Sequence, residues 1–129
     1  MNQTENTKKE YSYAEFMISR SPKKNHDAIL QLENKSLDMF GREGVLYDLF
    51  ILGNSTSWEG FTNISKALSA SPGKEDVWVN IMSYRDKKHR DEFVAKMSND
   101  KECQEGYEEF TKLLTPGSEI FTGEFKRVP

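Results

Sequence analysis

His89, Arg90 and Asp91 form the sharpest local cluster of chemically versatile side chains in the sequence. In a functional interpretation, His89 is a general base or a ligand at the mouth of a pocket, and Arg90 binds a carboxylate. In a structural interpretation, all three lie in the first turns of a helix, where Asp91 stabilises the helix dipole and Arg90 forms a surface ion pair. The pattern favours the structural interpretation, and His89 and Arg90 stay candidate catalytic residues.

Asp48 and Asn80 are polar residues inside two otherwise apolar stretches. A buried polar group needs a hydrogen-bond partner, and a bound ligand can supply one. The alternative is that the two side chains pair with each other, with Arg85 or with trapped water. Asp48 is therefore a third catalytic candidate, and Asn80 is a ligand-binding candidate.

Large side chains complete the set of ligand-binding candidates, which comprises Trp78, Asn80, Met82, Tyr84 and Trp58. Trp58 lies in a long connection, where it either covers a pocket or anchors the connection to the core, and the sequence favours the anchor. We predict no metal site, because two histidines and one cysteine do not supply three or four convergent ligands. We predict no cofactor, and Cys103 occupies a helical apolar position that indicates packing.

Strands and helices, which the spacing of apolar residues predicts, must hold these side chains in place. Alternating apolar residues predict strands at residues 11–18, 45–52, 77–84 and 120–128. Helical spacing predicts helices at residues 24–42, 86–97 and 101–114. The connection at residues 53–76 is too long to lack structure, so we expect a short helical turn near residues 64–68. Residues 1–10 are predicted to be a disordered tail, and residues 11–129 a single domain.

The element order β-α-β-β-α-β is the split β-α-β pattern, which predicts a ferredoxin-like α+β fold. Such a fold has a four-stranded antiparallel sheet with both helices on one face. We expect the β-branched face of the 77–84 strand to pack against the helices. The opposite face is then bare, and it carries Trp78, Asn80, Met82, Tyr84 and Asp48. A bare apolar face predicts a homodimer that forms through the sheet face.

Charge and composition exclude several classes of protein. The formal net charge is −3 and no extended basic stripe occurs, which argues against nucleic acid as the main partner. No apolar run approaches the roughly 20 residues of a membrane-spanning helix, and the polar N-terminus is unlike a signal peptide. One cysteine cannot form an internal disulfide, so a cytoplasmic setting fits best.

One stretch carries a family resemblance. Residues 73–84 form a strand that leads into Arg85-Asp86-Lys87-Lys88-His89-Arg90-Asp91, and Ala95-Lys96-Met97 and Asn99-Asp100 follow. This arrangement resembles the YbaA-like family of small bacterial proteins of unknown function, in which a similar strand precedes a His-Arg-Asp helix start. The family's Asp-Pro-Arg break is absent, because Lys101 follows Asp100, and Asp86 replaces a serine. The resemblance covers residues 11–128 in element order and residues 73–100 in motif.

The resemblance implies the dimeric α/β barrel superfamily, whose members pair sheets face to face, and it implies no established reaction. Three functions stay open. The first is an uncharacterised homodimer that binds a small apolar or aromatic ligand in a pocket between sheet and helices. The second is a cofactor-independent oxygenase or isomerase of the dimeric α/β barrel type. The third is a haem-binding protein that uses His89, although no clear first-strand asparagine accompanies it.

Overall fold

Four strands and four α-helices make up the described part of the chain, which in this computed structural model is residues 10–129. The strands are β1 (Tyr13–Pro22), β2 (Leu46–Ile51), β3 (Glu75–Tyr84) and β4 (Phe121–Lys126). The helices are α2 (His26–Arg42), α3 (Ile64–Ala67), α4 (Lys87–Ser98) and α5 (Lys101–Leu113), and a 3-10 turn, η1 (Lys23–Asn25), precedes α2. None of these helices is long and apolar enough to cross a membrane. The tail predicted at residues 1–10 lies, except for Glu10, outside the described residues.

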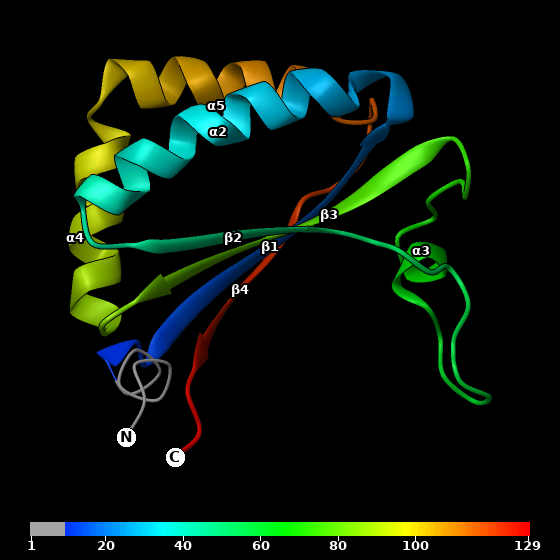
Figure 1. The fold of residues 1–129 in the computed structure, drawn as a ribbon, viewed down its shortest axis with the longest axis horizontal. Helices are drawn as coiled ribbons and strands as arrows, with labels where there is room; N and C mark the ends of the chain where they lie inside the picture. Colours follow the sequence, from blue (N-terminus) through cyan, green and yellow to red (C-terminus); the bar gives the residue numbers. More distant parts are fainter. Residues whose placement is uncertain (1–9) are drawn as a thin grey trace.

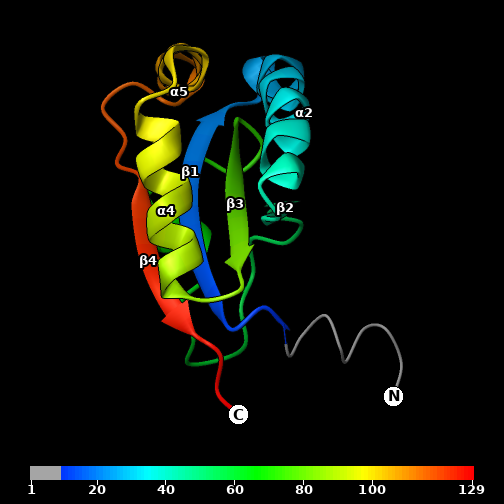
Figure 2. The same cartoon turned by 90° about the vertical axis from the view of Figure 1, so that its left-hand side faces the viewer.

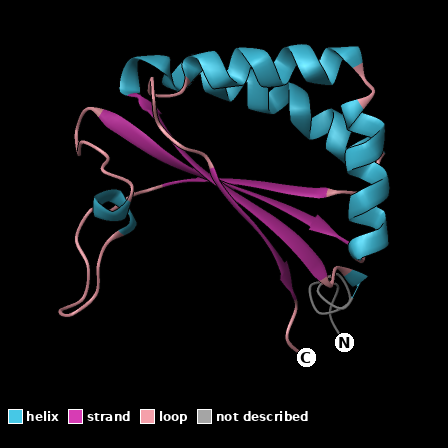
Figure 3. Ribbon diagram, turned by 180° about the vertical axis from the view of Figure 1, so that it is seen from behind, coloured by secondary structure: helices cyan, strands magenta, loops and turns pink. Residues whose placement is uncertain are grey.

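The strands form one antiparallel sheet in the order β2-β3-β1-β4. Helices α2, α4 and α5 cover one face of this sheet (Figure 1, Figure 2). The connection between β2 and β3, residues 52–74, contains α3 and projects as an arm away from the three long helices (Figure 3). The predicted α+β class and four-stranded antiparallel sheet are confirmed.

Short polar side chains begin three of the helices. Asp86 accepts a hydrogen bond from the His89 N–H at 2.8 Å at the start of α4, and Asp100 accepts one from the Cys103 N–H at 3.0 Å at the start of α5. Asn63 accepts one from the Ser65 N–H at 2.9 Å at the start of α3. The helical turn predicted near residues 64–68 is therefore confirmed.

The helices cover the sheet face that the sequence analysis left bare. Trp78, Asn80, Met82 and Tyr84 are between 2% and 7% exposed and lie under the helices, so their predicted place on a bare face is wrong. Two polar N–H groups of this set have partners in the covered layer. The Trp78 indole N–H donates to Ser21 Oγ at 2.8 Å, and the Asn80 amide N–H donates to Tyr47 and Glu33. Alternation separates the two faces of a strand, but it does not say which face meets the helices.

The opposite side of the sheet, here called the open face, carries mostly apolar side chains. Its members are Ala14, Phe16, Ile18, Arg20, Leu46, Asp48, Phe50, Val77, Val79, Ile81, Ser83, Phe121, Gly123 and Phe125, which the strand register places on one side. Phe50 is 58% and Phe125 is 54% exposed. Asp48 pairs with Ile81 and lies on this face, whereas Leu49 is the residue opposite Asn80. The predicted grouping of Asp48 with Asn80 is therefore wrong.

Two clusters of buried side chains fill the layer between sheet and helices. The cluster near α4 joins Tyr13, Val45, Met82, Tyr84 and Phe93. The cluster near α2 and α5 joins Ile29, Trp78, Phe110 and Leu114. Residues of both clusters line a cavity in this layer.

Candidate functional site

A cavity of about 810 Å³ lies between the helix-covered face of the sheet and the helices α2, α4 and α5. Small-molecule sites commonly measure about 300–1,000 Å³. The apolar part of its wall is formed by Met17, Leu32, Met39, Phe40, Met82, Phe93, Val94, Met97 and Phe110. All methionines of residues 10–129 are in this wall. Methionine side chains are flexible and polarizable, so such a wall can adapt to the shape of a ligand.

Three polar side chains from three elements meet in the cavity wall: Glu33 from α2, Tyr47 from β2 and Asn80 from β3. The Tyr47 hydroxyl donates to Glu33 Oε2. The Asn80 amide N–H donates to the Tyr47 hydroxyl oxygen and, at 3.3 Å, to Glu33 Oε1. Glu33 is 7% exposed and Asn80 is 3% exposed. The three side chains therefore form a buried hydrogen-bonded network.

The network leaves one acceptor unused. Asn80 Oδ1 is buried and has no hydrogen-bond partner among the described residues. Ser19 Oγ is also buried without a hydrogen-bond partner among these residues, but Ser19 does not line the cavity. A buried polar atom without a partner costs roughly 1–3 kcal/mol, and a ligand N–H or O–H group would remove that cost.

The protonation of the network follows from its burial. Burial raises the pKa of the Glu33 carboxyl, and the hydrogen bonds from Tyr47 and Asn80 only partly oppose it. Burial, followed by the nearby Glu33 carboxylate, raises the pKa of the Tyr47 hydroxyl. Tyr47 therefore stays a hydrogen-bond donor at neutral pH, while Glu33 can take up or release a proton in an apolar setting.

Arg90 binds a carboxylate of its own chain. Its Nε and Nη2 atoms lie 3.2 Å and 3.0 Å from the two oxygens of Glu15, and Glu124 Oε1 lies 3.6 Å from Nε. The hydrogen bonds to Glu15 raise the pKa of the guanidinium. Glu15 lines the cavity, but Arg90 does not. This geometry favours the structural interpretation, in which Arg90 forms an ion pair within its own chain. The pair holds Glu15 at the edge of the cavity.

His89 has both ring nitrogens occupied by backbone groups. Nε2 donates to the Glu43 carbonyl oxygen at 2.9 Å, and Nδ1 accepts from the Arg85 N–H at 3.1 Å. The ring is 7% exposed and lies outside the cavity wall. A general base or a haem ligand would have to give up one of these bonds, so the geometry favours a structural role.

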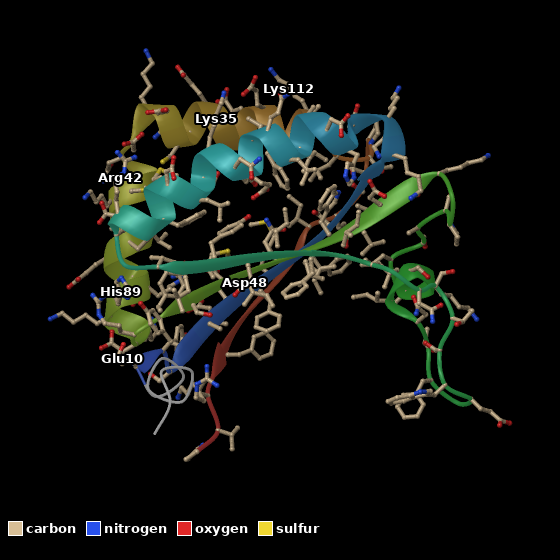
Figure 4. The ribbon with its side chains drawn as sticks, in the orientation of Figure 1. Glu10, Lys35, Arg42, Asp48, His89 and Lys112 are labelled. Atoms are coloured by element: carbon tan, nitrogen blue, oxygen red, sulfur yellow. The ribbon has the colours of Figure 1, made fainter. Side chains whose placement is uncertain are left out.

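The other site residues predicted from the sequence lie in different parts of the structure. Met82 and Tyr84 line the cavity with Asn80, whereas Trp78 packs beside it, with its ring centroid 5.3 Å from that of His26. Trp58 is 80% exposed on the arm, so the expectation that it anchors the arm to the core is wrong. Figure 4 shows Asp48 on the side of the sheet away from the helices.

Cys103 lies against two thioether sulfurs in the cavity wall. Its Sγ atom is 2.8 Å from Met39 Sδ and 3.3 Å from Met97 Sδ. Burial raises the pKa of the thiol, which keeps it protonated at neutral pH and fits a packing role. Across residues 10–129, no group of three or more His, Cys, Asp or Glu side chains is placed to hold a metal ion.

Glu33 and Tyr47 were not among the site residues predicted from the sequence. A signal for Glu33 was present, because it falls between Ile29 and Phe40 on the apolar stripe of the predicted helix. A carboxyl at such a position must find buried donors. Tyr47 belonged to the predicted apolar side of its strand, and its hydroxyl partner comes from another element.

The chain belongs to DUF1428, a family of proteins of unknown function whose model matches residues 12–112. No curated protein matches it. Membership of a family without an assigned function was expected, and it is confirmed.

Two solved structures are similar to the chain. One is the crystal structure of a conserved protein from Methanosarcina mazei Go1, with a TM-score of 0.60 and 7% identity over 95% of this chain and 99% of that chain. The other is the de novo designed protein Foldit4, with a TM-score of 0.46 and 17% identity over 92% of this chain and 100% of that chain. The first likeness shows a shared fold.

Proposed function

We propose that the chain is a small-ligand-binding protein and that its ligand occupies the cavity between sheet and helices. One observation carries the proposal: Asn80, whose Oδ1 is a buried acceptor without a partner among the described residues, lines a largely apolar cavity of about 810 Å³. The ligand is mainly apolar and has an N–H or O–H group for Asn80. The single cysteine supports the cytoplasm as its setting.

The proposal is tested by titrating methionine-methyl-labelled protein with phenylbutanol and following the methyl NMR signals. We expect saturable shifts at Met17, Met39, Met82 and Met97, because all four line the cavity. Asn80→Ala removes the acceptor and should weaken binding about tenfold. Trp58→Ala is the control and should bind like the wild type. Absence of saturable methyl shifts with a series of such alcohols would contradict the proposal.

We also propose that two copies pair through the open face, as in a ferredoxin-like dimeric α/β barrel and in keeping with the YbaA-like resemblance. The strand order and the one-sided helix layer support this arrangement. The arm lies on the same side of the sheet as the open face, because its residues Ser65 and Pro72 lie around Val77. Trp58 and Phe61 on the arm are 80% and 66% exposed, and they add apolar surface for a partner copy.

Light scattering after size-exclusion chromatography tests the pairing. Phe50→Glu places a charge in the open face and should convert a dimer into a monomer that keeps its fold. Leu37→Glu on α2, where the side chain is 45% exposed, is the matched control and should leave the dimer intact. A wild type that is monomeric at high concentration, or a Phe50→Glu dimer, would contradict the pairing.

Glu33 supports a second function, that of a cofactor-independent isomerase. Its buried carboxyl, with a raised pKa, could remove a proton from the carbon next to a ligand carbonyl and return one from solvent. The test is deuterium exchange of phenylbutanone in deuterium oxide. Exchange that the wild type accelerates and Glu33→Gln does not would support this function, and absence of acceleration would remove it.

A further inference from the structure

Glu33 is a buried acid without a basic partner. Its two oxygens accept hydrogen bonds from Tyr47 and Asn80, which are both neutral groups. No Lys, Arg or His of the described residues lies within ion-pair distance of it. Buried carboxylates are normally paired, because an isolated charge in an apolar layer is strongly unfavourable. A carboxylate can accept about four hydrogen bonds, so Glu33 has room for a further donor.

The charges around the cavity favour a cation. Besides Glu33, the acidic residues in its wall are Glu15, Glu102, Glu105 and Glu109, and the basic residues are Lys35 and Arg42. Lys35 and Arg42 are exposed residues of α2, both labelled in Figure 4. Glu102, Glu105 and Glu109 are exposed like the two bases, and Glu15 is paired with Arg90. Glu33 is therefore the buried acid of the wall that has no basic partner among the described residues, and it attracts a positively charged ligand.

Aromatic rings stand next to the buried acid. The Phe40 ring stacks on Tyr47 with centroids 4.6 Å apart and on Phe93 with centroids 5.0 Å apart. All three residues line the cavity. Aromatic rings stabilise a nearby organic cation through their π electrons and also cover an apolar ligand body.

We propose that the cavity binds an organic amine, with a protonated primary or secondary amino group at Glu33 and Asn80 and an apolar body against the methionine and phenylalanine wall. The proposal rests on the proposed ligand-binding function and adds the charge of the ligand. The ammonium donates one N–H to Glu33 and one to Asn80 Oδ1, which gives both groups the partner that they lack. Charge-assisted hydrogen bonds of this kind are about twice as strong as neutral ones.

Binding of an amine should depend on pH. The amine needs ionised Glu33, and burial raises the pKa of this carboxyl. Amine affinity should therefore fall as the pH falls through that raised pKa. The groups that face Glu33 are the Tyr47 hydroxyl from β2 and the Asn80 amide from β3, and the Tyr47 hydroxyl stays protonated over this range.

The other charged groups around the cavity should contribute little to the pH dependence of amine binding. Glu15 is held by Arg90 of α4. The acids of α5 and the bases of α2 are exposed at the rim, where solvent screens them. Binding of an uncharged ligand should therefore change little with pH, and the difference between the two ligands isolates Glu33.

The test compares phenylbutylamine, phenylbutanol and phenylbutyrate, which share one carbon skeleton, by isothermal titration calorimetry of the full chain. We expect the amine to bind at least about tenfold more tightly than the alcohol, and the acid to bind most weakly. Glu33→Gln should bring the amine to within about threefold of the alcohol while alcohol binding persists. Glu108→Gln removes the same charge from α5 outside the cavity wall and should keep the preference for the amine.

The outcomes distinguish this inference from the function on which it rests. If the alcohol binds but the amine has no advantage, or if Glu33→Gln keeps that advantage, the inference is wrong and the ligand-binding function stands. If none of the three compounds binds to the wild type, both are wrong. Proton release on amine binding at mildly acidic pH, absent with the alcohol, would support Glu33 as the counter-ion.

Discussion

Replacement of Tyr47 by phenylalanine tests the buried network in isolation. The change removes one hydroxyl, which donates to Glu33 and accepts from Asn80. The ring stays and keeps its stack on Phe40, with centroids 4.6 Å apart. Loss of stability in this variant therefore reports on the polar network and not on apolar packing.

The expected loss follows from the two hydrogen bonds. A hydrogen bond to a charged group contributes about 1.5–3 kcal/mol to stability, and a neutral one about 1 kcal/mol. Tyr47→Phe should lower the free energy of unfolding by about 2–4 kcal/mol at mildly alkaline pH, where Glu33 is ionised. Because the Tyr47 hydroxyl lowers the pKa of Glu33, its removal raises that pKa further.

This pKa change sets the sign of the pH dependence. A carboxyl whose folded-state pKa is raised stabilises the folded state below the unfolded-state pKa, and this stabilisation is lost as the pH rises through the folded-state pKa. The variant, with the higher folded-state pKa, should therefore recover stability relative to the wild type as the pH falls toward the ordinary carboxyl range of roughly 4.

Urea unfolding at a series of pH values measures the effect. Tyr107→Phe is the matched control, because Tyr107 is 56% exposed, and its free energy of unfolding should stay within about 0.5 kcal/mol of the wild type. A loss below about 0.5 kcal/mol for Tyr47→Phe would refute the reasoning. So would a loss that grows as the pH falls.

Three further substitutions test other parts of the fold. Ile29→Ala, at a fully buried position of α2, should lower the free energy of unfolding by about 2–5 kcal/mol in urea, and no detectable loss would mean that the helix does not pack there. Asp86→Ala removes the cap of α4 and should cost about 1 kcal/mol in the same assay, whereas a gain would contradict the cap. His89→Leu leaves the Arg85 N–H and the Glu43 carbonyl without partners and should cost about 2–5 kcal/mol in thermal unfolding. Phenylbutanol binding to folded His89→Leu should be unchanged, and its loss would restore His89 as a site residue.

The elements could be predicted from the sequence because their signals are local. Alternation predicts the strand at Leu46–Ile51. Asp86 and Asp100 indicate the starts of α4 and α5, because each accepts a hydrogen bond from the N–H group three residues later. The cavity could not be predicted in this way. Its wall brings together residues from β1, β2, β3 and three helices, and the volume between them depends on how closely the helices approach the sheet.

The sheet face that the helices cover could be predicted from the position of Glu33. A carboxyl on the apolar stripe of α2 faces the sheet, so the face beneath it must offer buried hydrogen-bond donors. The face with Tyr47 and Asn80 has donors, while Val79, Ile81 and their neighbours on the open face have none near the centre of the sheet. Asp48 on the open face is exposed within a single chain, so its polarity does not require a hydrogen-bond donor from the helices. Because the buried acid on α2 needs hydrogen-bond donors, the face of β3 that carries Asn80 is the one that packs against the helices. Asn80, with its unused acceptor, therefore lies in the cavity wall.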